Sequence, residues 1–103
     1  MRVTTIISWT TENAKAINAR FGDFKSGNVP DEVKQAFGRL NIVAWEKLTT
    51  NRVLTIAEGD EIDIAVWNGY WQDLADFELT EPSYNMKDDE VLGKIFPPAY
   101  MQL

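Results

Sequence analysis

The chain has 103 residues, of which 45% are hydrophobic and 25% are charged, and its formal net charge is −6. These values fit one folded domain with a single core, and they exclude a chain that is disordered throughout. The 10 basic residues are scattered among 16 acidic ones, so nucleic acid and an anionic membrane surface are not expected as partners. The apolar runs are too short to span a bilayer and the amino terminus lacks a signal-peptide layout, so we expect a cytoplasmic protein.

The sequence contains neither cysteine nor histidine. Disulfides, thiolate nucleophiles and Cys-ligated metals are therefore excluded, and so are imidazole bases and histidine-ligated zinc or haem. Any catalysis would have to use carboxylates, Lys, Tyr, Arg, Trp or a bound cofactor. We predict no metal site and no resident cofactor.

The first half of the chain predicts a strand, a helix, a loop and a second strand. Residues 3–9 are β-branched and aromatic, as in a buried strand. Apolar positions at helical spacing predict a helix over 12–21, which Gly22 would end. Residues 23–32 are rich in Gly, Asn and Pro and are predicted to form a loop. The second strand is placed within 33–48, where both alternating faces are largely apolar and are therefore expected to be covered.

The second half predicts a turn, a strand, a helix, a strand and a short final helix. A turn at 49–51 leads into a strand at 52–58, which makes an antiparallel hairpin with the strand before it. Apolar residues at three- and four-residue spacing predict a helix over 60–74, with acidic residues in its first turn. Residues 76–81 alternate as a fourth strand, and residues 87–96 form a helix that two prolines end.

This order is β-α-β-β-α-β followed by a helix, so the predicted fold class is α+β, a ferredoxin-like unit with an antiparallel sheet. We place the domain at residues 1–96 and a carboxy-terminal tail at 97–103. The helices of such a unit cover one face of its sheet and leave the other face open. The simplest cover for the open face is a second copy of the sheet, so the expected partner is the chain itself, as a homodimer.

The motif pattern along the chain also resembles a family of small uncharacterised bacterial domains in the dimeric α/β-barrel superfamily. The resemblance covers residues 2 to about 96. It implies a dimeric α/β barrel, and the wider superfamily includes cofactor-free monooxygenases, isomerase-like proteins, haem enzymes and stress-response proteins. The matching stretches are Ile7–Trp9, Ala19–Phe21, Pro30–Val33, Gly38–Arg39, Ala57–Glu58, Trp67–Leu74, Phe77–Leu79 and Asp88–Glu90.

The four tryptophans are the first candidates for a binding site. Trp67 and Trp71 are four residues apart and share one face of the predicted helix, while Trp9 and Trp45 lie on predicted strands. Such aromatic side chains either line a cavity for an apolar ligand or pack in the core and the dimer interface, and a tryptophan stripe at helical spacing is more often core.

Arg39 and Asn41 are the second candidates. The alternation of the predicted strand puts both on one face with Phe37, Val43 and Trp45. Polar groups on a largely apolar face need partners. Arg39 is therefore expected to hold a ligand carboxylate through a bidentate contact, to pair with an acidic residue across the dimer, or to lie at a wet strand end.

Three functions follow from these features. The first is a protein that binds an apolar or aromatic small molecule, such as an acyl-chain-like one, in a cavity beside the sheet. The alternatives are a cofactor-free enzyme of the monooxygenase or isomerase kind, which the superfamily and the Asn41/Trp45 pair suggest, and a structural or regulatory dimer without a ligand. The ligand-binding residues predicted for the first function are Trp9, Phe37, Arg39, Asn41, Trp45, Trp67, Trp71 and Phe77.

Overall fold

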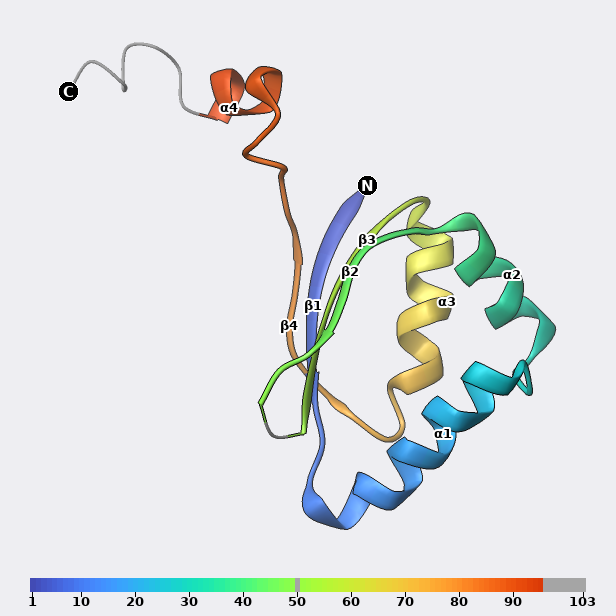
Figure 1. Cartoon of the computed structure of the whole chain (residues 1–103). Helices are drawn as coiled ribbons and strands as arrows, with labels where there is room; N and C mark the ends of the chain where they lie inside the picture. Colours follow the sequence, from blue (N-terminus) through green and yellow to red (C-terminus); the bar gives the residue numbers. More distant parts are fainter. Residues whose placement is uncertain (50, 96–103) are drawn as a thin grey trace.

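The protein is described by a computed structural model that covers residues 1–49 and 51–95. The domain combines one sheet with helices, and Figure 1 shows the helices α1, α2 and α3 on one side of the sheet and α4 beyond the end of β4. The described elements are β1 (Arg2–Ser8), a 3-10 turn (Thr11–Asn13), α1 (Ala14–Ser26), α2 (Asp31–Arg39), β2 (Asn41–Lys47), β3 (Arg52–Glu58), α3 (Glu61–Trp71), β4 (Asp76–Pro82) and α4 (Asp89–Ile95).

The four strands lie in the order β2-β3-β1-β4, and every neighbouring pair is antiparallel. The connection from β1 to β2 passes over β3, and the connection from β3 to β4 passes over β1. These two interleaved β-α-β units are compatible with the ferredoxin-like fold expected from the sequence. The α+β class and the antiparallel sheet are therefore confirmed.

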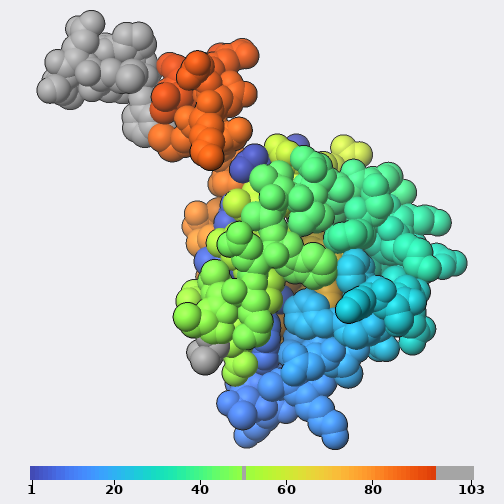
Figure 2. Space-filling model, in the orientation of Figure 1, coloured from blue at the N-terminus to red at the C-terminus, as the bar shows by residue number. Residues whose placement is uncertain are grey.

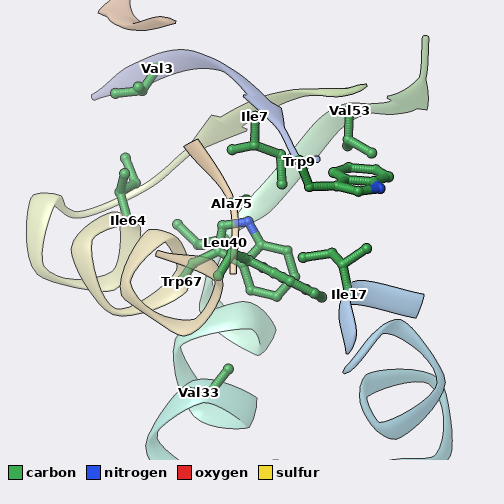
Figure 3. Packing of buried hydrophobic residues seen from close by; sticks show 11 residues of the cluster. Val3, Ile7, Trp9, Ile17, Val33, Leu40, Val53, Ile64, Trp67 and Ala75 are labelled. Atoms are coloured by element: carbon green, nitrogen blue, oxygen red, sulfur yellow. The ribbon is translucent and has the colours of Figure 1, made fainter. Parts of the chain in front are cut away.

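Alternation along the central strands creates the core. Val3, Thr5 and Ile7 on β1 are buried beneath the helices, and the residues between them lie on the open face of the sheet. β3 alternates in the same way. The core packs between this sheet face and the helices, as Figure 3 shows for its central members. The buried cluster consists of Val3, Ile7, Trp9, Ile17, Val33, Leu40, Val53, Ile64, Trp67, Trp71 and Ala75.

The second strand begins later than predicted, because residues 31–39 form the helix α2. Pro30 precedes a first turn that contains Asp31 and Glu32, where proline and acidic residues both favour a helix start. Val33 and Ala36 are buried on the inner face of α2. The prediction that Phe37 and Arg39 lie on a strand is therefore wrong, and so is their shared face with Asn41 and Trp45.

The first helix also continues past its predicted end. α1 passes through Gly22 and ends at Gly27, whose φ of 80° is the left-handed conformation that glycine adopts without a Cβ penalty. The Gly27 amide donates to the carbonyl oxygens of Asp23 and Phe24. Most of the predicted loop at 23–32 is therefore helical, and Phe24 packs against the core.

The other predicted elements are confirmed with small shifts at their ends. β3 has the predicted bounds, β2 and β3 pair as the antiparallel hairpin, and α3 and α4 lie within the predicted helices. The tail at 97–103 and residue 96 lie outside the described residues. Within the described part of the chain, no helix is both long and apolar enough to cross a membrane.

The open face of the sheet carries a half-buried apolar strip across its middle. Leu79 on β4 lies opposite Ile6 on β1, which lies opposite Leu54 on β3. Ion pairs flank the strip, with Arg52 bound to Glu78 at 2.8 Å and Arg2 near Glu58 at 3.4 Å. No helix covers this face in Figure 1.

We expect Ile17→Ala to destabilise the domain by about 2–5 kcal/mol, the usual range for truncating a buried isoleucine. Ile17 lies on the inner face of α1 and is completely buried in the core. Ile62→Ala on α3 is the matched control, because Ile62 is 76% exposed and its loss should change stability by less than ~0.5 kcal/mol. Urea unfolding of both variants measures the difference, and equal midpoints would contradict the described core.

Candidate functional site

A pocket opens at the end of the sheet that carries the β2–β3 hairpin, between β2 and α1. Its volume is about 270 Å³, at the small end of the range for ligand sites. In Figure 2 it lies between the blue atoms of α1 and the green atoms of β2. Its lining residues are Trp9, Asn18, Phe21, Trp45, Lys47 and Val53.

Three aromatic rings form the walls of this pocket. Phe21 on α1 lies between the two tryptophans, with its ring centre 6.1 Å from that of Trp9 and 6.3 Å from that of Trp45. Trp45 on β2 pairs with Thr55 on the neighbouring strand β3, so the two side chains lie on the same face of the sheet. Thr55 is buried beneath the helices, and Trp45 therefore also points toward them. Figure 3 shows the Trp9 indole between Val53 and Ile17, with its nitrogen on the side away from Trp67. The aromatic walls therefore come from three separate elements of the fold.

Two polar side chains complete the lining. Asn18 lies on α1 one turn before Phe21. Lys47 pairs with Val53 across β2 and β3, so it lies on the same sheet face as Trp45 two residues earlier. The Lys47 Nζ donates a hydrogen bond to the Thr49 carbonyl oxygen at 3.2 Å. The pocket therefore has apolar walls and a cationic group at one side.

The structure separates the predicted tryptophans into two groups. Trp9 and Trp45 line the pocket. Trp67 and Trp71 lie on one face of α3, as predicted, and both are only 3% exposed. They belong to the core behind the pocket. Phe37 on α2 also lies behind it, with its ring centre 6.0 Å from Trp45 and 4.8 Å from Trp67.

Arg39 and Asn41 lie away from the pocket and have partners within the chain. Arg39 holds the buried Asp63 of α3, with its Nε 3.0 Å and its Nη2 2.8 Å from the carboxylate oxygens. These hydrogen bonds hold the pKa of Asp63 below its ordinary value and raise the pKa of Arg39. The Asn41 amide donates to the Glu58 carboxylate at 2.7 Å. The acidic partner of Arg39 therefore lies within the same chain and on a helix, not across a dimer as the prediction had it, and Asn41 belongs to the open face.

Phe77, the remaining predicted residue, lies beside a different hollow. That hollow has a volume of about 420 Å³ and a more polar lining from α3 and β4. Its lining residues are Asn68, Gln72, Ala75, Asp76, Phe77 and Thr80. Phe77 also packs against the edge of the core. The structure therefore does not bring Phe77 together with Trp9 and Trp45.

Four lining residues escaped the sequence-based prediction, namely Asn18, Phe21, Lys47 and Val53. A signal was available for two of them. Lys47 follows Trp45 by two residues and so shares its strand face, and Phe21 was already placed on the apolar stripe of the first helix. Nothing in the sequence indicated that Asn18 and Val53 meet at the pocket, because that requires the position of α1 over the hairpin.

No family model, curated protein or solved structure matches the chain. Within residues 1–49 and 51–95, no group of three or more acidic side chains is arranged to hold a metal ion. The chemistry of the site must therefore be inferred from the pocket itself.

We expect Arg39→Gln to lower stability at pH 7 and the loss to shrink as the pH falls. The pKa of Asp63 is lowered in the folded state by the hydrogen bonds from Arg39. The pair's contribution is therefore present above the ordinary carboxylate pKa of about 4 and is lost as the pH falls through the lowered value. Urea unfolding at pH 7 and near pH 3 gives the two differences from the unmutated chain.

Arg52→Gln is the matched control for this experiment, because both side chains of the Arg52–Glu78 pair are 41% exposed. Exposed pairs contribute little. A loss in Arg39→Gln that was equally large at both pH values would contradict a stabilising role for the ionised Asp63.

Proposed function

We propose that the protein binds an apolar or aromatic small molecule in the pocket formed by Trp9, Phe21 and Trp45. The single observation that carries this proposal is that these rings border an open volume of about 270 Å³ and do not fill it. Apolar walls with a few polar groups are the usual composition of a small-molecule site. The proposal makes binding, and not a reaction, the function that the geometry supports best.

The exposure of Trp45 supports this assignment. Its side chain belongs to an edge strand and is 38% exposed, although its ring also packs 5.6 Å from Trp67 and 5.6 Å from Phe24. Contact between a large aromatic side chain and water is unfavourable, and burying that surface lowers the free energy. A ligand ring that covered Trp45 would remove that contact, and the packing behind it would hold the indole in place.

We also propose that the chain forms a homodimer through the open face of its sheet, as in the dimeric α/β barrels that its motifs resemble. The support is the apolar strip of Leu79, Ile6 and Leu54, which lies on the face that the helices leave uncovered. Ion pairs at both ends of the strip are placed to form a polar rim around an apolar interface centre. The pocket lies on the opposite side of the sheet, so ligand binding does not require the dimer.

Titration with 2-naphthalenemethanol, a neutral aromatic probe, tests the binding site. We expect the intrinsic tryptophan fluorescence to change with saturation, and Trp45→Ala to weaken binding by roughly tenfold, since an aromatic wall contributes about 1–2 kcal/mol. Tyr84→Ala is the control, because Tyr84 is 66% exposed and lies outside the pocket. Absence of saturable binding in the unmutated chain, or equal binding by Trp45→Ala, would contradict the proposed site.

Light scattering coupled to gel filtration tests the dimer. We expect twice the monomer mass of 11.7 kDa, and we expect Leu54→Asp to give the monomer because it places a charge within the apolar strip. Ile62→Asp, which puts the same charge on an exposed position of α3, should remain dimeric. A monomeric unmutated chain would contradict the proposed interface.

A further inference from the structure

The polar groups of the pocket all offer hydrogen atoms to a ligand. Lys47 is the charged residue of the lining, Asn18 has an amide group, and no Asp or Glu is among the lining residues. The indole N–H of Trp9 forms no hydrogen bond within the described residues, and it is a donor without acceptor capacity. Lys47 and the Trp9 indole can only donate, while the Asn18 amide can donate or accept, so a ligand that accepts hydrogen bonds can satisfy all three groups.

Lys47 differs from the arginines of the chain in having no carboxylate partner. The four arginines each form an ion pair with an acidic side chain. Lys47 is in none of the ion pairs of residues 1–49 and 51–95, and the Thr49 carbonyl is its hydrogen-bond partner there. An ammonium group has three donors, so this contact leaves two for a ligand. The positive charge at the pocket is therefore not neutralised locally.

The charge at Lys47 decides between two ligand classes. Aromatic walls attract cations through their faces, and the net charge of −6 would add a weak general attraction. Physiological salt screens the general attraction beyond a distance of about 8 Å, whereas the charge of Lys47 acts at close range because Lys47 is part of the pocket wall. A cationic ligand would be repelled at that wall, and an anionic one would be held.

The geometry of β2 sets the shape of the ligand. Trp45 and Lys47 are two residues apart on one strand face, which separates their positions by roughly 7 Å. A flat ring against the Trp45 and Phe21 walls would place a carboxylate near Lys47 if the group were attached directly or through a short linker. The small pocket volume of about 270 Å³ favours such a compact molecule over a long acyl chain.

We infer that the ligand of this pocket is a small aromatic carboxylate, whose ring lies between Trp9, Phe21 and Trp45 and whose carboxylate pairs with Lys47. This inference rests on the proposed function and adds to it the charge and class of the ligand. Asn18, the other polar residue of the lining, offers its amide group for a second hydrogen bond. The paired charge gives the site its selectivity, while the rings supply affinity for any flat apolar group.

Three probes of nearly equal shape test this inference, namely 2-naphthoate, 2-naphthalenemethanol and 2-naphthylmethylammonium. In titrations at pH 7 and low salt, we expect the carboxylate to bind roughly tenfold more tightly than the alcohol, because a charge-assisted hydrogen bond changes the affinity by about that factor. We expect the ammonium compound to bind most weakly. The preference for the carboxylate should fall as salt is added.

The variants Lys47→Met and Lys47→Arg separate charge from shape. Lys47→Met should lose the preference for 2-naphthoate and keep its affinity for the alcohol within about twofold, whereas Lys47→Arg should retain the preference. Lys34→Met on α2 is the charge-matched control, because Lys34 is not a pocket residue and its loss should leave the preference unchanged.

The outcomes distinguish the inference from the function on which it rests. Equal binding of the carboxylate and the alcohol, or a preference that survives in Lys47→Met, would overturn the inference while leaving the aromatic pocket in place. Tightest binding of the ammonium compound would make the pocket a cation site and overturn it as well. Failure of all three probes to bind would overturn the proposed function itself.

Discussion

The fold depends on a set of aromatic contacts around Phe24. Its ring centre lies 4.8 Å from that of Phe37, 5.6 Å from Trp45 and 5.2 Å from Trp67. These rings come from α1, α2, β2 and α3, so one side chain connects each helix over the sheet to the edge strand. Edge-to-face packing of this kind combines a large buried area with a preferred geometry. The packing around Phe24 positions α1 over the hairpin, and the pocket lies between the two.

The same contacts explain why the pocket walls are held in place. Phe21 lies three residues before Phe24 on α1, and its ring is 4.6 Å from that of the buried Trp71. The wall is therefore the outer edge of the core and not a separate loop structure. Side chains packed in this way lose little conformational freedom when a ligand binds, which reduces the entropic cost of association. Lys47 is the exception in the lining, because it lies at the exposed end of β2.

The sequence predicted the sheet well because its central strands have a clear two-residue alternation. It failed at α2 because the spacing of apolar residues between Val33 and Leu48 is compatible with the two-residue period of a strand as well as the 3.6-residue period of a helix. The helix start at Pro30 and Asp31 was read as part of a loop. That single error moved Arg39 into the predicted site, where the structure pairs it with Asp63. Arg39 and Asp63 are 24 residues apart in the sequence, and their contact depends on how α2 packs against α3. Local sequence patterns do not predict that packing.

Of the predicted ligand-binding residues Trp9 and Trp45 line the pocket, whereas its polar members Asn18 and Lys47 were not predicted, for a related reason. Whether an aromatic residue fills a core or borders a cavity depends on where the neighbouring helix lies, and for α1 that position depends on contacts distant in sequence, such as Phe24 with Phe37 and Phe21 with Trp71. Once α1 is placed, the charges of the molecule divide between two surfaces. On the open face the two arginines, Arg2 and Arg52, each pair with a glutamate. At the pocket Lys47 is exposed and forms no ion pair with any residue that the structure describes, so the carboxylate of the proposed ligand would be its partner.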